Sequence, residues 1–138
     1  MSAKDFERDD ILNALGDLAK RLSESEQPAR IRLVGGAALS IAYYDRRSTR
    51  DVDALISPAV PVLEVAQQIA RERGWQDDWL NDAATMFLPL GGERRWDPVV
   101  REGAVIVEVA SAEMLLVMKL NAGRGRRDSD DIEYLLDL

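Results

Sequence analysis

Amphipathic helices alternate with short apolar strands along this sequence, and the alternation limits the folds open to it. Residues 5–22 place Ile11, Leu15, Leu18 and Leu22 at helical spacing, while residues 105–109 are rich in β-branched side chains. Helices are predicted at 5–22, 37–44, 61–73, 111–122 and 128–138, and strands at 31–34, 50–56, 85–90 and 105–109. This order predicts a mixed α/β (α+β) fold, with a small mixed sheet flanked by helices.

The length of the chain fits one hydrophobic core. It has 138 residues, of which 46% are apolar, and neither a repeat nor a linker interrupts it. Gly74 is expected to stop the helix at 61–73, and Ser111 and Asp128 are expected to cap the two helices that follow them. We therefore predict a single domain that spans residues 1–138.

Residue types that are missing exclude several kinds of chemistry. The sequence has neither cysteine nor histidine, so disulfides, zinc sites, thiol nucleophiles and histidine triads are excluded. No apolar stretch approaches the roughly 18–20 residues of a membrane span, and the first residues lack the order of a signal peptide. The expectation is a cytoplasmic protein without a membrane partner, whose chemistry uses carboxylates, lysine, arginine, hydroxyls and backbone groups.

The charge of the chain is acidic overall but its basic residues are unusual. The net charge of −7 argues against a broad surface for nucleic acid, which relies on neutralising phosphates. The chain nevertheless has 15 arginines and only three lysines, and arginine suits forked recognition of phosphate. The arginines gather at 46–50, 94–95 and 124–127, either as parts of solvated loops or as a local phosphate site.

A pair of aspartates marks the second predicted strand. Asp51 and Asp53 project to the same face of a strand, because side chains at i and i+2 do so. Two adjacent carboxylates repel each other unless one is protonated or a cation lies between them. Oxygen ligands without histidine or cysteine favour Mg²⁺. The alternative is a solvated strand edge.

Glu108 and a pair of glycines extend this pattern. Glu108 is the one acid in the apolar run 105–109, and it would supply a third carboxylate if its strand lies beside the strand of Asp51 and Asp53. Such a site holds two metal ions about 3.5–4 Å apart for in-line displacement at phosphorus. Gly35 and Gly36 end the first strand and open a helix, where backbone N–H groups can cradle a phosphate. Each feature alone also has a structural explanation.

Two blocks of sequence resemble a known family. Residues 33–36 (Leu-Val-Gly-Gly) followed by 47–53 (Arg-Ser-Thr-Arg-Asp-Val-Asp) resemble the signature of the DNA polymerase β-like nucleotidyltransferase superfamily. Residues 119–124 (Lys-Leu-Asn-Ala-Gly-Arg) and 127–132 (Arg-Asp-Ser-Asp-Asp-Ile) add a resemblance to bacterial minimal and abortive-infection-type nucleotidyltransferases of toxin–antitoxin systems. The resemblance implies a nucleotidyltransferase fold.

The resemblance also implies roles for residues. Asp51, Asp53 and Glu108 would be catalytic ligands of two Mg²⁺ ions. Gly35 and Gly36 would contact the phosphates of a nucleoside triphosphate. Many members of the family have serine where this chain has Gly36, and the third acid of the family is commonly aspartate rather than glutamate.

Four further residues are given roles by the same resemblance. Lys119 would be a catalytic cation that contacts the triphosphate or the acceptor, although a lysine on an apolar helix can also extend its charge to the surface. Ser40, one turn beyond Gly36, would replace the missing serine hydroxyl. Arg50 and Arg127 are expected to contact the nucleotide.

The predicted function is transfer of a nucleoside monophosphate from an NTP to an acceptor hydroxyl. The resemblance implies that the acceptor is a tRNA end or a partner protein, and that the protein belongs to a toxin–antitoxin pair. A second hypothesis is a non-catalytic, antitoxin-like binding module with the same fold, which neutralises a partner protein. A third is a small α/β domain whose acids are surface residues only.

Overall fold

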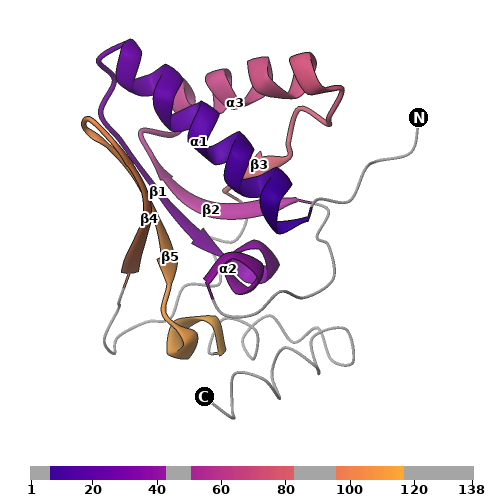
Figure 1. Cartoon of the computed structure of the whole chain (residues 1–138), viewed down its shortest axis with the longest axis vertical. Coiled ribbons are helices and arrows are strands. Elements are labelled where there is room, and N and C mark those ends of the chain that lie inside the picture. The colour runs from indigo at the N-terminus through magenta and orange to yellow at the C-terminus, as the bar shows by residue number, and fades with distance from the viewer. Residues whose placement is uncertain (1–6, 43–50, 83–95, 117–138) are drawn as a thin grey trace.

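The computed structural model describes residues 7–42, 51–82 and 96–116 of the chain. These residues form three labelled helices and five strands (Figure 1). In chain order they are α1 (Arg8–Glu24), β1 (Ala29–Val34), α2 (Gly35–Ala42), β2 (Val52–Ser57), α3 (Ala59–Arg73), β3 (Leu80–Asn81), β4 (Trp96–Glu102) and β5 (Val105–Ala110). The predicted alternation of helices and strands is therefore confirmed over the described residues.

The five strands form one mixed sheet with β1 at its centre. Their order is β3-β2-β1-β5-β4. β1 is antiparallel to β2 and parallel to β5, and the edge strand β4 is antiparallel to β5. The predicted fold class, a mixed α/β domain with a small sheet and helices packed on it, is confirmed.

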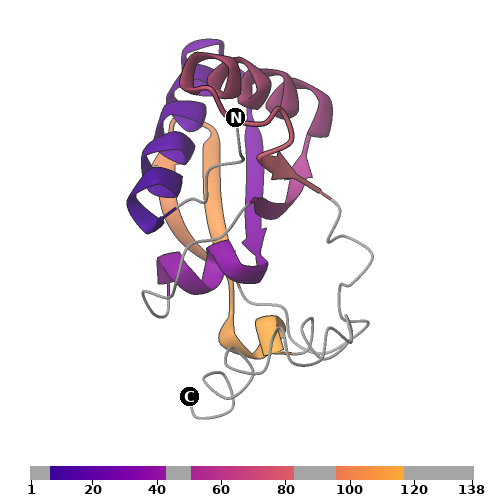
Figure 2. The same ribbon diagram turned by 90° about the vertical axis from the view of Figure 1, so that its right-hand side faces the viewer.

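The described helices cover one face of this sheet. Figures 1 and 2 show α1 and α3 side by side against it, with α2 at the carboxyl end of β1. The alternation along β1 explains the arrangement, because Ile31 and Leu33 are fully buried beneath the helices. Arg30 and Arg32 project to the opposite face, which carries no helix of the described part of the chain. We call this second face the open face.

The start of β2 is held from its outer side. The backbone N–H of Val52 donates to the carbonyl oxygen of Trp79 at 2.6 Å, and β3 then continues in parallel with β2. Trp79 is buried and its indole N–H donates to the carbonyl of Ala66 in α3 at 2.8 Å. These bonds fix the first residues of β2 between β1 and the α3–β3 connection.

The two edge strands, β3 and β4, were not predicted from the sequence. β3 has two residues, too few for a periodic signal, and β4 contains Pro98 and mostly exposed side chains. Proline is accepted on an edge strand, and β4 is irregular between Pro98 and Val100. The predicted strand at 85–90 and the predicted helix at 128–138 lie outside the described residues.

Two predicted ends of helices are confirmed. Gly74 ends α3 in the left-handed conformation, and its N–H donates to Ala70. The hydroxyl of Ser111 accepts from the N–H of Met114 at 3.2 Å, so it caps the helical turn at 112–116. In the described ranges, none of the helices has the length and apolar character that crossing a bilayer requires.

Gly16 offers a test of how α1 is built. It lies inside this helix, and a Cβ added there would meet no atom within 4 Å. Gly16→Ala is therefore expected to raise the free energy of unfolding by about 0.5–1 kcal/mol, because alanine loses less backbone entropy in a helix. Urea denaturation measures the change, and a lower midpoint for the variant would contradict the packing described for α1.

Candidate active site

Asp51 and Asp53 lie at the end of the sheet where β1 passes into α2. Asp51 immediately precedes β2 and is exposed, and Asp53 is the second residue of β2 and is half-buried. Asp53 pairs with Val34, the last residue of β1. Asp53 belongs to the open face, because it pairs with Val34 and alternates with the buried Val52 and Ala54. Asp51 precedes the strand, so its place on the same face stays a prediction.

Gly35 lies directly against Asp53. It has a φ of +68°, and a Cβ built on it would lie 3.2 Å from Oδ2 of Asp53. Any other residue would combine an unfavourable backbone conformation with a methylene group against the carboxylate. The glycine that ends β1 and the aspartate of β2 are 18 positions apart in the sequence, and the antiparallel pairing brings them into contact.

Glu108 does not join the two aspartates. Glu108 was expected to join them if its strand lay beside β2, but β5 pairs with β1, so β1 separates Glu108 from Asp53. Glu108 pairs with Arg32, whereas Asp53 pairs with Val34. Two strand spacings and a two-residue offset put their backbones more than about 10 Å apart. In the described residues, no three acidic side chains are grouped closely enough to hold a metal ion.

Two arginines of β1 bind the carboxylate of Glu108 instead. Nε of Arg30 donates to Oε1 at 2.7 Å, and Nε of Arg32 approaches the same oxygen at 3.5 Å. The side chain of Glu108 is 8% exposed. Burial by itself would raise the pKa of Glu108, but the hydrogen bonds and charges of both arginines outweigh it and hold the pKa below its usual range.

The other predicted site residues divide into two groups. Gly36 follows Gly35 in the first turn of α2, and Ser40 is buried in the same helix with 4% of its surface exposed. Arg50, Lys119 and Arg127 lie outside the described residues, so their roles stay predictions.

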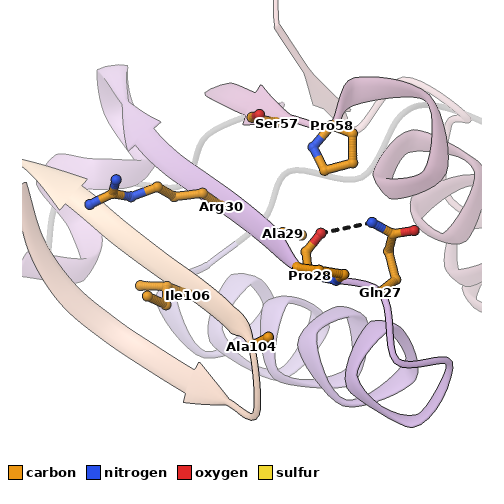
Figure 3. A pocket seen from close by; sticks show the side chains of 8 residues that line it. All are labelled: Gln27, Pro28, Ala29, Arg30, Ser57, Pro58, Ala104 and Ile106. Atoms are coloured by element: carbon orange, nitrogen blue, oxygen red, sulfur yellow. Dashed lines mark hydrogen bonds between the residues drawn. The ribbon is translucent and has the colours of Figure 1, made fainter.

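A shallow hollow of about 590 Å³ opens at the other end of the sheet (Figure 3). Its lining includes Pro28, Ser57 and Pro58, together with Arg30. Arg30 pairs with Ser57, four residues along β1 from the pair of Val34 with Asp53, so the hollow lies about 13 Å from the aspartates. The chemistry expected from the aspartates therefore does not take place in this hollow.

Sequence reasoning did not single out Arg30, Arg32 or Trp96, which meet on the open face. The guanidinium of Arg32 lies over the indole of Trp96, 5.2 Å from the ring centroid. The signal for the arginines was present, since they alternate with Ile31 and Leu33 along β1. Such alternation indicates one buried face and one charged face of a strand.

Comparison with known proteins gives one match that spans most of the chain. A family model described as "Nucleotidyltransferase of unknown function (DUF6036)" matches residues 10–135. The chain belongs to this family. The matched DUF6036 range includes Gly35, both aspartates and Glu108. Neither the curated proteins nor the solved structures contain a match to the chain.

Membership of DUF6036 supports nucleotidyl transfer as the general class of activity. The narrower resemblance to polymerase β-like and abortive-infection-type enzymes stays a prediction.

Gly35→Ala tests the contact between the β1–α2 junction and Asp53. The variant is expected to lose about 1–3 kcal/mol of unfolding free energy, from the positive φ and from the crowded carboxylate. Gly74→Ala is the matched control, because Gly74 has a φ of +71° and no atom within 4 Å of its Cβ position. Its expected loss is about 1 kcal/mol.

A double-mutant cycle isolates the contact. In an Asp53→Ala background, Gly35→Ala should cost no more than Gly74→Ala does, since the crowding carboxylate has been removed. Chemical denaturation of the four proteins gives the coupling free energy. Equal costs of Gly35→Ala in both backgrounds would contradict the contact.

Glu108→Gln tests the buried ion pairs. We expect the variant to lose about 1–2 kcal/mol of unfolding free energy at pH 7. Because the pKa of Glu108 is lowered on folding, this stabilisation is present above the ordinary glutamate pKa of about 4.3 and is lost as the pH falls through the folded-state pKa. The gap between variant and wild type should therefore narrow below pH 4. Denaturation midpoints across the acid range measure it, and a gap that does not change with pH would count against the ion pairs.

Proposed function

We propose that this protein transfers a nucleoside monophosphate from an NTP to an acceptor hydroxyl, with Asp51 and Asp53 at the reacting centre. The observation that supports the proposal is the proximity of Gly35 to Asp53, because it brings the turn that is expected to bind phosphate next to one of the two aspartates. The DUF6036 match supports the same class of reaction.

The described residues fit one divalent cation better than two. Asp53 is the second residue of β2 and Asp51 directly precedes this strand, and Gly35 has no Cβ that would crowd Oδ2 of Asp53. These two aspartates would hold Mg²⁺, which would lower the pKa of the attacking hydroxyl and offset the charge of the leaving pyrophosphate. Glu108 is engaged with Arg30 and Arg32, so it does not complete the predicted two-metal set without giving up those ion pairs.

The remaining steps belong to the chain and the substrates. Gly35 and Gly36 at the start of α2 would bind and orient the triphosphate through backbone N–H groups. The acceptor oxygen attacks the α-phosphorus, the bond from this phosphorus to the bridging oxygen breaks, pyrophosphate leaves, and the hydroxyl proton passes to solvent. Catalysis of this kind consists mainly of positioning and electrostatic stabilisation. Lys119, Arg50 and Arg127 are proposed as additional cations for the phosphates.

The acceptor belongs to the proposal as well. A tRNA end or a side chain of a partner protein would present the hydroxyl, within a toxin–antitoxin pair. This part of the proposal follows from the resemblance of residues 119–132 to abortive-infection-type enzymes.

Transfer of label tests the proposed reaction. The protein would be incubated with Mg²⁺, each α-labelled NTP, and either bulk tRNA or candidate partner proteins. Asp51→Asn and Asp53→Asn are each expected to lower transfer by at least about 100-fold, since each removes a charged ligand at the reacting centre. Glu64→Gln, an exposed change on α3, is the control and should retain wild-type transfer. Undiminished turnover by either aspartate variant would defeat the assignment.

A second candidate function is nucleotide binding without catalysis. The observation in its favour is the absence of a three-acid group among the described residues, together with the arginines on Glu108. This candidate predicts that the wild-type protein binds MgATP but releases no pyrophosphate with any NTP or acceptor. Measurable pyrophosphate release that depends on Asp53 would exclude it.

A further inference from the structure

Glu108, Arg30 and Arg32 form a small cluster on the open face, which we call the arginine cluster. Arg32 and Glu108 occupy directly paired positions of β1 and β5, and Arg30 lies one repeat earlier on β1. Glu108 is nearly buried, while the side chains of Arg30 and Arg32 are 50% and 30% exposed. The cluster therefore consists of a fixed carboxylate with two solvent-accessible guanidinium groups, and it carries one net positive charge.

The hydrogen bonds to Glu108 use only one edge of each guanidinium. Arg30 donates from Nε and Nη2, and Arg32 donates from Nε alone. Within the described parts of the chain, the Nη1 groups of both arginines and Nη2 of Arg32 donate no hydrogen bond. A guanidinium has five N–H donors, so each arginine keeps donors that Glu108 does not use. These donors can form the forked contact that fits phosphate oxygens.

Trp96 limits the movement of Arg32. Its indole lies beneath the guanidinium at 5.2 Å, so Arg32 is held by Glu108 on one side and by an aromatic surface on another. An arginine that is already held in place loses less conformational entropy when it binds an anion. Arg32 is thus arranged for recognition of an anion in a way that a mobile surface arginine is not.

The cluster also lies close to the candidate active site. Arg32 and Val34 are two residues apart on β1, and Val34 pairs with Asp53, so Arg32 and Asp53 are diagonal neighbours on the open face. Arg30 is one repeat farther, about 13 Å from the row of Asp53. It extends over the open face, away from Pro28 and Pro58 (Figure 3). The two arginines therefore follow β1 outward from the aspartates.

We propose that Arg30 and Arg32, held by Glu108 and Trp96, form a phosphate-binding site on the open face beside Asp53. The ligand is a phosphate group carried either by the nucleoside triphosphate or by a nucleotide chain that supplies the acceptor. This site would select a phosphate-bearing substrate for the candidate active site at Asp51 and Asp53, and in that respect the proposal rests on the proposed function. Glu108 is here a positioning residue for the two arginines.

Binding measurements without turnover test this site. The two probes are MgATP and a short single-stranded oligoribonucleotide, titrated into wild-type protein in a calorimeter. Arg32→Gln is expected to lower the affinity for at least one probe about tenfold, because a charge-assisted forked contact is lost. Arg71→Gln is the matched control, since it removes the same charge from an exposed position on α3, in the helix layer, and it should bind both probes as the wild type does.

Arg32→Lys separates geometry from charge. Lysine keeps the positive charge but lacks the planar fork and the Nε that meets Glu108. We expect it to lose nearly as much affinity as Arg32→Gln. Full affinity of Arg32→Lys would mean that charge alone suffices and would overturn the proposed geometry.

The two probes identify the source of the phosphate. Weaker binding of MgATP alone assigns the site to the triphosphate, and weaker binding of the oligoribonucleotide alone assigns it to a nucleotide chain. If Arg30→Gln and Arg32→Gln, separately and combined, bind both probes with wild-type affinity, the proposed site does not exist. Thermal unfolding of each variant shows that the comparison is made between folded proteins.

The binding test of the arginine cluster and the transfer test of the proposed reaction can fail separately. A wild-type protein that transfers no label but binds a probe through Arg32 would refute the proposed reaction and leave the phosphate site standing. Conversely, transfer that depends on Asp53 but is indifferent to Arg30 and Arg32 in both affinity and KM would refute only the phosphate site.

Discussion

The antiparallel pairing of β1 with β2 is the interaction on which the candidate site depends. It sets Val34 opposite Asp53. The chain therefore has to leave the sheet at residue 35, directly beside the carboxylate of Asp53. Gly35 makes this turn with a positive φ and without a Cβ. The positions of the sheet, the start of α2 and Asp53 therefore depend on one another. A change in the register of β1 and β2 would separate Gly35 from Asp53.

The same central strand also keeps Glu108 away from the aspartates. β1 lies between β2 and β5, and its open face presents arginines rather than a gap for a metal ion. A carboxylate as buried as Glu108 requires compensating charge, and Arg30 and Arg32 provide it across the strand pair. The charge pattern of the open face thus runs from acidic residues at the start of β2 to a net basic cluster along β1 and β5.

Much of the fold could be predicted from the sequence, because burial on one face leaves a periodic pattern. The apolar spacing of α1, the alternation in β1 and the β-branched run of β5 each carry that signal, as does Gly74 at the end of α3. β4 lacks such a periodic pattern, because it is an edge strand with Pro98 and mostly exposed side chains. The position of β3 is set by the hydrogen bond from Val52 to Trp79 and by pairing with β2, and two residues are too few for a hydrophobic pattern.

The candidate site was predictable where neighbours along the chain determine it. Asp53 takes the face of β2 that its alternation with Val52 and Ala54 predicts, and Gly35 directly follows the last residue of β1. The partner of Glu108 depends on strand order, which the sequence pattern leaves open, so the arginines that bind it were missed. Local periodicity shows that Arg30 and Arg32 share a face, but only the sheet order shows that Glu108 lies beside them.

Paramagnetic broadening by Mn²⁺ would locate the proposed cation site. The proposed divalent cation would bind where Gly35 meets Asp53. In backbone amide spectra recorded with substoichiometric Mn²⁺, signals of Gly35 and of residues 52–54 should broaden first, and those of Arg30 and Ser57 at the far end of the sheet should persist. Broadening centred on Arg30 and Ser57, or no selective broadening at Gly35, would contradict the account.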